Sequence, residues 1–596
     1  MSGAMPTGAA GDAGTALTAA APDLRPMGAL AVLLTLPTLE DVIAWHAELT
    51  ARPVAGQVEA LAAARTVLVG CVSPAAAAAA LGALAARTPG AARSAEGQAV
   101  QIEVVYDGED LEEVARLTGF SPQGVIDAHT GTAWTAAFGG FAPGFTYLTG
   151  GDARLQVPRR STPRTAVPAG SVALAGEYSA VYPGASPGGW QLIGRTDAPL
   201  WRTDRAQPAL IAPGDTVRFV AVREQARVGA GAGAVSADGQ APPADGAGSA
   251  QRDADAATPL APAATAALAP ALHVLDPGLR TLVQDLGRPG RGDLGVTASG
   301  AADAPSARQA NRLVGNDEGA AVLESLLGGT AVRAGEQALV LALSGAPASA
   351  TISPSAADER PDRPDLTPDR PGRPDRPAPH CAPFALYPGE TLRLAPPAAG
   401  LRTYLAVRGG IDVPPVLGSR ATDTLSGIGP APLAGGDVLP VGTEPHRAVG
   451  PAETPATTPP AAGERAVLRM LPGPRADWFG EGGAQQLCAR EWRVGPASDR
   501  VGVRLALADE AGAPLQRERD GELASEGMAP GAIQVPPSGL PVVFLADHPV
   551  TGGYPVIAVV HPDDLPRLAQ LAPGTAVRFA LHDAPTPAPA SPQETS

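Results

Sequence analysis

Between residues 27 and 124, two kinds of hydrophobic pattern alternate along the chain. Short apolar or alternating runs predict strands at 28–36, 65–72 and 100–107. Apolar positions at helical spacing predict helices at 39–49, 73–87 and 109–119. Ser73 before Pro74 is a typical helix start, and Gly119 is a typical helix end. The whole stretch is therefore interpreted as a small α+β domain.

The pattern changes after about residue 125, where strands become short and turns become rich in glycine and proline. Such punctuation with few helices is typical of β-sandwiches and barrels. The predicted fold class is mainly β, with tandem barrels after the small α+β domain. The expected divisions are 1–26 disordered, 27–124 α+β domain, 125–222 barrel, 223–271 linker, 272–442 barrel with a disordered insertion at 354–379, 443–463 linker, 464–582 barrel and 583–596 disordered tail.

Three pieces of sequence recur in the same order in two distant parts of the chain. The first set is VPAGSVALAG (167–176), Gly188-Gly189-Trp190 and LIAPGDTVRF (210–219). The second set is VPPSGLPVVFL (535–545), Gly552-Gly553-Tyr554 and QLAPGTAVRF (570–579). An ordered repeat of turn motifs indicates related β-barrels in tandem. The glycine pair marks either the close approach of a ligand or neighbouring barrel, or a strand crossing or bulge.

Composition and charge exclude several classes of function. The net charge is −16, without the basic footprint of a nucleic-acid-binding protein. All 44 basic residues are arginine, so the chain has no lysine for a P-loop, a Schiff base or covalent biotin. No apolar run is long enough to span a membrane, and no signal peptide is evident. Three widely spaced cysteines suit a reducing cytosol, so a cytoplasmic location is expected.

The first candidate site lies in the stretch 127–170, which combines a glycine-rich aromatic loop with clustered arginines. Clustered guanidinium groups match carboxylate or phosphate ligands, although solvated barrel charges are the alternative. His129 is a candidate acid or base, although a lone histidine is more often structural. The candidate anion-binding residues in this half are Arg159, Arg160, Arg164, Gly188, Gly189, Trp190 and Arg195.

The second candidate site lies in 276–324 and in two later motifs, where polar residues crowd glycine-rich sequence. A glycine-rich loop followed by the expected helix DAPSARQANRLVGN (303–316) is a plausible anion cradle. No HExxH or CxxC motif occurs, and no metal ligand or nucleophile is assigned. The candidates are Asp285 and Asp303 for catalysis, and Gln284, Arg288, Ser299, Asn311, Asp499, Arg500, Asp547, Gly552 and Gly553 for binding.

Long motifs in both halves resemble known families. GGFAPGFTYL (139–148) and PRRSTPRTAVPAGSVALAG (158–176) are similar to the B subunit of 5-oxoprolinase, also known as the sporulation-kinase inhibitor or allophanate hydrolase subunit 1 family. TLVQDLGRPGRGDLGV (281–296) and GAIQVPPSGLPVVFLADHPVTGGYP (531–555) are similar to the C subunit, the biotin-dependent carboxyltransferase-like, urea amidolyase-related family. The sequence thus resembles a fusion of 5-oxoprolinase subunits B and C, although SRAT (419–422) and ADHPV (546–550) depart from the usual C motifs.

The resemblance implies cyclophilin-like barrels and a cytosolic assembly with a separate A subunit, which opens 5-oxoproline to glutamate with ATP and Mg. A site between the B-like barrel and the C-like half is expected. There the arginines would hold anions, His129 would serve as acid or base, and Asp285, Asp303 and Asn311 would orient substrate or metal. Two alternatives stay open: a carboxyltransferase acting with biotin on a partner protein, and a non-enzymatic inhibitor of a histidine kinase. A homo-oligomer also stays open.

Overall fold

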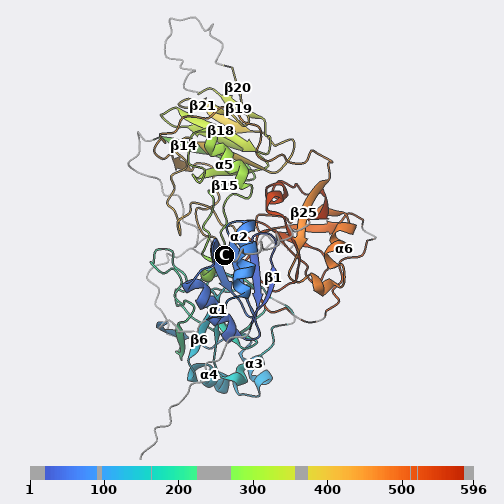
Figure 1. The fold of residues 1–596 in the computed structure, drawn as a ribbon. Helices are drawn as coiled ribbons and strands as arrows, with labels where there is room; N and C mark the ends of the chain where they lie inside the picture. The colour runs from blue at the N-terminus through green and yellow to red at the C-terminus, as the bar shows by residue number, and fades with distance from the viewer. Residues whose placement is uncertain are drawn as a thin grey trace, which may run out of the picture.

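The computed structural model describes residues 21–89, 97–160, 162, 164–223, 270–355, 374–509, 512–519, 521 and 523–582. Four parts follow one another along the chain: an N-terminal sheet, barrel 1, a sandwich and barrel 2 (Figure 1). The N-terminal tail before residue 21, most of the expected linker at 223–271, most of the insertion at 354–379 and the tail from residue 583 lie outside the described residues.

The N-terminal unit is a four-stranded sheet in the order β1-β2-β4-β3 with two helices. Its elements are β1 (Asp23–Pro26), β2 (Ala31–Thr35), α1 (Leu39–Ala51), β3 (Gln57–Ala62), β4 (Thr66–Cys71) and α2 (Pro74–Ala85). The Thr38 side chain caps α1, and the Ser73 side chain caps α2 as the sequence predicts. The strands and helices expected before residue 90 are confirmed.

Barrel 1 is a seven-stranded sheet in the order β12-β9-β10-β7-β6-β13-β5. Backbone hydrogen bonds between Val105 and Arg195 join its two edges and nearly close it. Strands β8 and β11 form a separate two-stranded side ribbon. The elements are β5 (Ala99–Val104), α3 (Leu111–Thr118), α4 (Pro122–Gly131), β6 (Trp134–Gly139), β7 (Thr146–Thr149), β8 (Arg164–Val167), β9 (Ser171–Ala175), β10 (Tyr178–Val181), β11 (Ser186–Gly188), β12 (Gln191–Arg195) and β13 (Thr216–Ala221).

The boundary expected at residue 124 differs from the structure. Strand β5 pairs in parallel with β13 over all six of its residues, and therefore belongs to barrel 1. The helices α3 and α4 pack into the same core, through Val114 and Val125. The sequence misplaced this boundary because the parallel partner of β5, strand β13, lies far away in the chain. Taken locally, the strand and helix pattern of 100–119 looks like a continuation of the preceding unit.

Residues 271–440 form two facing sheets rather than the single barrel expected for 272–442. One sheet has the order β20-β19-β22-β17-β14-β24 and the other β15-β16-β23-β18-β21, and they share one apolar core. We call this part the sandwich. Its elements are β14 (Ala271–Pro277), β15 (Arg280–Gln284), α5 (Ala304–Leu313), β16 (Val322–Leu326), β17 (Thr330–Ala334), β18 (Leu339–Gly345), β19 (Ala350–Ser353), β20 (Arg376–Ala378), β21 (Pro383–Leu386), β22 (Thr391–Leu394), β23 (Arg402–Val407) and β24 (Val438–Pro440).

Barrel 2 is closed, in the order β25-β32-β29-β30-β27-β26-β33. Strands β28 and β31 form a side ribbon outside the barrel, as β8 and β11 do in barrel 1. The elements are β25 (Ala466–Pro472), α6 (Gly483–Ala489), β26 (Trp492–Val494), β27 (Gly502–Leu507), β28 (Glu526–Gly527), β29 (Ala532–Gln534), β30 (Val542–Phe544), β31 (Thr551–Gly552), β32 (Val556–Val560), α7 (Leu565–Leu568) and β33 (Ala576–Leu581).

The two barrels share one topology, which confirms the tandem duplication. When the seven barrel strands are numbered in chain order, both barrels have the neighbour order 1-7-2-3-5-4-6, with strands 1 and 7 parallel. Strand 2 starts in each with a buried tryptophan whose indole N–H donates to the carbonyl five residues earlier, at Trp134 and Trp492. A shared local hydrogen bond at the same strand supports the equivalence beyond the strand order.

The repeated sequence pieces match the topology in two of three cases. The Gly-Gly-aromatic pieces both precede strand 6, and the last pieces both form strand 7. The first pieces do not correspond, because 167–176 leads into strand 4 of barrel 1 whereas 535–545 leads into strand 5 of barrel 2. Both are turns that feed a strand of the central hairpin, which explains why their sequences look alike.

The N-terminal sheet packs against barrel 2, although these parts lie at opposite ends of the chain (Figure 1). Met27, Leu33 and Leu68 share a buried core with Phe544 and Val559. The stretch 443–463, expected as a linker, carries no helix or strand, but the Thr457 hydroxyl donates to Asp303 at 2.8 Å. The described parts therefore pack against one another instead of forming separate domains on linkers.

Candidate functional site

An aromatic face fills the end of barrel 1 that carries the glycine-rich loop. Tyr147 stacks on Phe138 with ring centroids 4.4 Å apart, and Trp190 lies edge-on to Phe145 at 5.6 Å. Tyr182 also contacts Phe145 edge-on, at 5.3 Å. Burial raises the pKa of Tyr182 to about 12 and also raises the pKa of Tyr147, so both hydroxyls stay neutral hydrogen-bond donors near neutral pH.

Three arginines, Arg159, Arg160 and Arg164, surround this face, and we call them the arginine cluster. Asp110 accepts a hydrogen bond from Arg160 at 2.5 Å and another from Arg164 at 2.9 Å. Burial alone would raise the pKa of Asp110, but the bonds from Arg164 and from the Leu192 N–H outweigh it and lower the pKa. Asp110 is therefore an anion that orients two guanidinium groups.

Some hydrogen-bond donors of the arginine cluster have no partner among the described residues. Nε of Arg160 and Nη1 of Arg164 are buried and have no hydrogen-bond partner in the described part of the chain. Arg159 is exposed, and no hydrogen bond or ion pair to it is found among the described residues. Its charge acts instead on Tyr147 and Tyr182. Unused guanidinium donors beside neutral hydroxyls are suited to a carboxylate or phosphate ligand.

The recurring glycine pair has a packing role. A Cβ at Gly188 would lie 2.4 Å from the Tyr182 hydroxyl oxygen, and the Gly189 carbonyl accepts from the Arg160 N–H at 2.8 Å. In barrel 2, a Cβ at Gly552 would lie 2.5 Å from the amide nitrogen of Gln534. A larger residue at either glycine of the side ribbons would thus require the opposing side chain to move, and in barrel 1 this close contact lies beside the arginine cluster. Gly553 is less crowded, with a Cβ 3.6 Å from the nearest atom, the Leu523 carbonyl oxygen.

The glycine-rich loop joins barrel 1 to the C-terminal half. The Phe141 N–H donates to the Thr551 hydroxyl at 3.3 Å, and the Tyr147 hydroxyl interacts with Thr551 and Ser525. A Cβ at Gly139 would lie 2.1 Å from the Asp293 carbonyl oxygen, so only glycine permits this approach. The aromatic face beside the arginine cluster therefore meets the side ribbon of barrel 2.

His129 does not fit the acid–base role expected from the sequence. Its side chain is 0% exposed, with Nδ1 bonded to the Tyr106 hydroxyl at 2.7 Å and Nε2 bonded to the Ser179 hydroxyl at 2.9 Å. Burial lowers the pKa of His129 to about 3, so the ring is neutral. A side chain closed off on every side cannot reach a substrate, and His129 is a core residue.

The second candidate set contains a cluster of buried, hydrogen-bonded side chains, which we call the buried network: Ser299, Glu324, Arg500 and Asp547. Arg500 donates to both carboxylate oxygens of Asp547, each at 2.9 Å, and to Glu324 at 2.6 Å. The Ser299 hydroxyl donates to Asp547 at 2.6 Å. Burial would raise the pKa of Asp547, but Arg500 and the hydroxyl donors hold it below its usual range. The network joins the sandwich to barrel 2.

Asp303 extends this network as the N-cap of α5. Its carboxylate accepts from the Ser306, Thr457 and Gln570 side chains, each at 2.8 Å. Asp303 is 0% exposed, so it positions the helix rather than contacting a substrate. It does not support the catalytic role predicted for it.

Other predicted residues brace backbone loops. Asp285 accepts from the Ser419 hydroxyl and the Arg420 N–H, each at 2.6 Å, and Gln284 and Arg288 donate to carbonyls of the same loop. Asn311 donates to the Glu318 and Ala320 carbonyls, and Asp499 accepts from two nearby backbone N–H groups. Arg195 pairs with Asp107 at 2.8 Å near the seam of barrel 1. These contacts give the residues structural roles.

Sequence reasoning missed Asp110 and Glu324, which orient the arginines in the two clusters. In both cases the local sequence gave an indication of the role. Glu324 is an acid in the middle of the apolar strand Val322–Leu326, where an unpaired charge is strongly unfavourable. Asp110 precedes helix α3 but makes no capping bond there. Its carboxylate is free to bind the arginines instead.

In the ranges that the structure describes, no group of three or more His, Cys, Asp or Glu side chains is arranged to hold a metal ion. The helices within these ranges are all too short or too polar to cross a membrane.

Comparison with known proteins defines the class of protein. The family model for the carboxyltransferase domain, subdomains C and D, matches residues 22–211, and the model for subdomains A and B matches residues 294–581. A crystal structure of the protein TTHA0988 is similar over 94% of this chain and all of its own, with a TM-score of 0.73 and 34% identity. Both halves are thus carboxyltransferase-type domains.

The particular relatives separate the two halves. The chain is 36% identical to the C subunit of 5-oxoprolinase from Escherichia coli over 311 residues, covering 52% of this chain and 90% of that protein. It is 48% identical to the B subunit of 5-oxoprolinase from Bacillus subtilis over 129 residues, covering 21% of this chain and 54% of that protein. Urea amidolyase of Lachancea kluyveri is 31% identical over 336 residues, but only 17% of it is covered. The chain belongs to the family of 5-oxoprolinase subunits B and C, here fused in one polypeptide.

Proposed function

We propose that this chain supplies the B and C parts of an ATP-dependent 5-oxoprolinase. Together with a separate A subunit, it would open the lactam ring of 5-oxoproline to glutamate in the cytosol. Similarity of each half to the matching 5-oxoprolinase subunit supports the assignment. The packing of the N-terminal sheet on barrel 2 supports joint action of the halves.

The arginine cluster carries the proposal. 5-Oxoproline has one carboxylate and a compact lactam ring with an apolar CH2–CH2 edge. The Arg159 guanidinium, which has no partner among the described residues, lies beside the aromatic face of barrel 1. The carboxylate would bind Arg159, and the ring would lie against Tyr182 and its aromatic neighbours. The neutral tyrosine hydroxyls would donate hydrogen bonds to the lactam oxygen, where negative charge develops.

The residues present also fit a phosphate group. Nε of Arg160 and Nη1 of Arg164 are buried donors without partners among the described residues, and Asp110 fixes both guanidinium groups in place. ATP would supply activation of the lactam by phosphoryl transfer to its oxygen. Water would then add to the activated carbon, the C–N bond would break with the nitrogen leaving as the amine, and hydrolysis of the resulting acyl phosphate would release glutamate and phosphate. The arginines would neutralise the phosphate charge, and any Mg²⁺ would enter with the nucleotide or on the partner. Proton transfer falls to water or to the A subunit, because His129 is enclosed in the core.

The proposal is tested by measuring ADP release after the purified chain is mixed with an A subunit. Release is expected only when both proteins and 5-oxoproline are present, with glutamate formed in equal amount. Absence of 5-oxoproline-dependent ADP release with every A subunit tried would reject the proposal. Omitting 5-oxoproline is the control for unrelated ATP hydrolysis.

A second candidate function is carboxyl transfer to or from biotin on a partner protein. The match to carboxyltransferase-domain families and the similarity to a urea amidolyase favour it. Because the chain has no lysine, the biotin would arrive on that partner. Exchange of labelled carboxyl groups between a biotinylated carrier and an amide substrate, without a need for 5-oxoproline, would support this candidate instead.

A further inference from the structure

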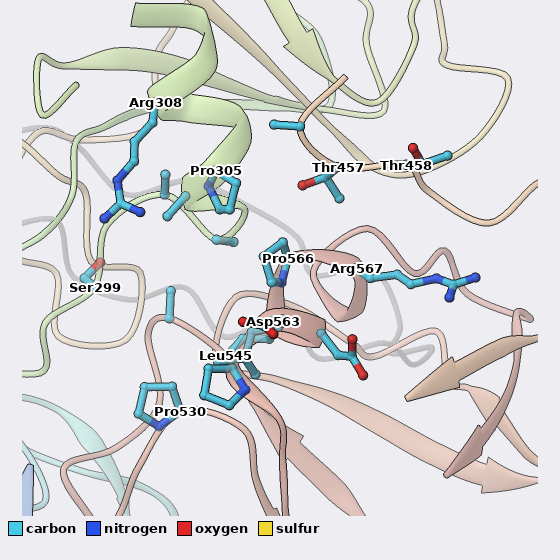
Figure 2. A pocket seen from close by; sticks show the side chains of 18 residues that line it. Ser299, Pro305, Arg308, Thr457, Thr458, Pro530, Leu545, Asp563, Pro566 and Arg567 are labelled. Atoms are coloured by element: carbon cyan, nitrogen blue, oxygen red, sulfur yellow. The ribbon is translucent and has the colours of Figure 1, made fainter. Parts of the chain in front are cut away.

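A cavity of about 690 Å³ opens where the sandwich, the segment 456–458 and barrel 2 meet. Neither the arginine cluster nor any part of barrel 1 lines it. Its volume lies within the usual range for sites that bind small molecules. Figure 2 shows Arg308 and Arg567 toward opposite sides of this space, with Pro305 and Pro566 between them.

The two arginines come from different parts of the fold, and both have only long ion-pair contacts among the described residues. Arg567 of α7 is 33% exposed, and its ion-pair partner among the described residues, Glu464, is 3.6 Å away. Its Nε is buried and has no hydrogen-bond partner in the ranges that the structure describes. Arg308 of α5 is 44% exposed, and its nearest carboxylate, on Glu318, is 3.9 Å away. Both guanidinium groups therefore keep donors for a ligand.

The carboxylates beside the cavity do not use these arginines. Asp564 accepts three hydrogen bonds from Arg469, two from its side chain and one from its N–H, at 2.6–3.0 Å. Burial would raise the pKa of Asp564, but the bonds from Arg469 outweigh it and lower the pKa. Asp563 is 72% exposed, so water screens its charge. The negative charge next to the cavity is thus either paired or solvated.

The remaining lining is apolar or hydroxylic, and it connects to the buried network. Leu545, Pro530 and Pro562 provide apolar surface, and Thr457 provides a hydroxyl. Ser299 lines the cavity with a backbone φ of 53°, a left-handed conformation uncommon outside glycine. The hydroxyl groups of Ser299 and Thr457 bond to Asp547 and Asp303, so the network holds these cavity walls rigid.

We propose that this cavity binds an anionic small molecule. Its carboxylate or phosphate group is held by the guanidinium donors of Arg567, with Arg308 on the opposite side of the cavity (Figure 2), and its apolar part lies against the proline and leucine wall. Carboxylate and phosphate ligands share this chemistry, because both accept the forked hydrogen bonds of a guanidinium group. The inference stands on the cavity alone and needs no A subunit, so it can fail while the proposed function holds.

The test is isothermal titration of the full chain with five separate probes: ATP, ADP, inorganic phosphate, 5-oxoproline and glutamate. Four proteins are compared: wild type, Arg567→Ala, Thr458→Phe and Arg578→Ala. Thr458 lines the cavity and is exposed, so a phenylalanine there fills space without disturbing the core. Arg578 is an exposed arginine of β33 outside the cavity and serves as the matched control. Circular dichroism and the melting temperature show whether each variant is folded.

At least one probe is expected to bind the wild type, with Kd raised about tenfold or more in Arg567→Ala and in Thr458→Phe, and unchanged in Arg578→Ala. The phosphate probes and the two carboxylate probes distinguish a nucleotide site from a substrate or product site. If no probe binds the wild type, or if all four proteins bind equally, the inference is overturned. It is also overturned if either Arg567→Ala or Thr458→Phe binds as the wild type does, because the anion would then lie away from Arg567 or outside the cavity.

Discussion

Removal of the Asp547 carboxylate should destabilise the junction between the sandwich and barrel 2. Asp547 is 0% exposed and accepts five hydrogen bonds: two from Arg500, one from Ser299, and two from the N–H and hydroxyl of Thr424, at 2.6–2.9 Å. In Asp547→Ala, Arg500 keeps Glu324 but loses its bidentate partner. Breaking a buried pair in this way costs about 3–5 kcal/mol.

The assay is thermal unfolding of the full chain by differential scanning calorimetry at neutral pH. For a large folding unit a loss of this size lowers the melting temperature of the affected transition by about 6 °C or more. Asp563→Ala is the matched control, since Asp563 belongs to the same barrel and is largely exposed; it should change the melting temperature by less than about 1 °C.

Two results would refute this reasoning. If Asp547→Ala melted within about 1 °C of the wild type, the network would contribute little to stability. A triple variant, Asp547→Leu with Arg500→Met and Glu324→Gln, removes the three charges of the network together and should recover part of the loss, because paired burial of charge is unfavourable in itself. If the triple variant were less stable than the sum of the three single variants, charge pairing would not be the cause.

Three further predictions concern other residues. His129→Leu should leave the rate of ADP release within about twofold of the wild type. It should lower the free energy of unfolding by about 1–3 kcal/mol, because the hydroxyls of Tyr106 and Ser179 lose their hydrogen-bond partner. A loss of activity of about 100-fold without unfolding would instead indicate an acid–base role. Burial would lower the pKa of His46, but the bond to Asp293 at 3.0 Å outweighs burial and raises the pKa. This contact therefore stabilises the fold below about pH 6.5, and the stabilisation is lost as pH rises through the raised pKa. The difference in melting temperature between wild type and Asp293→Asn should shrink from about pH 6 to about pH 8.5, and a constant difference would contradict this. Gly188→Ala should lower stability measured by urea unfolding by about 1–3 kcal/mol, because its Cβ would meet the Tyr182 hydroxyl oxygen at 2.4 Å, whereas Gly184→Ala has open space and should change little.

The hydrophobic pattern was sufficient for the local elements and for the duplication. Helices α1, α2 and α5 lie where their apolar spacing and caps predict, and the Gly-Gly-aromatic motif marks the same strand of both barrels. The pattern failed where the partner is remote. Strand β5 pairs with β13 more than 100 residues later, and nothing local distinguishes it from a strand of the first sheet. The two sheets at 271–440 likewise give the same short-strand pattern as a barrel.

The candidate site shows the same limit. The sequence located the arginine cluster, because three arginines stand close together in a glycine-rich stretch. It could not separate Arg159, which has no hydrogen-bond or ion-pair partner among the described residues, from Arg160 and Arg164, which bind Asp110. Arg567 and Arg308 were missed because each is an ordinary helix residue until the fold brings α7 and α5 to one cavity. Chemistry that depends on which partners are already used is visible only in three dimensions.

The central claim is that the arginine cluster of barrel 1 binds the reacting anion, and one comparison tests it most directly. Chain carrying Arg159→Ala and chain carrying Arg154→Ala are each assayed with an A subunit for 5-oxoproline-dependent ADP release. Arg154 is an exposed arginine of the same barrel that pairs with Asp152. We expect kcat/KM to fall on the order of 100-fold in Arg159→Ala and to stay unchanged in Arg154→Ala. Equal activity of the two variants would contradict the account.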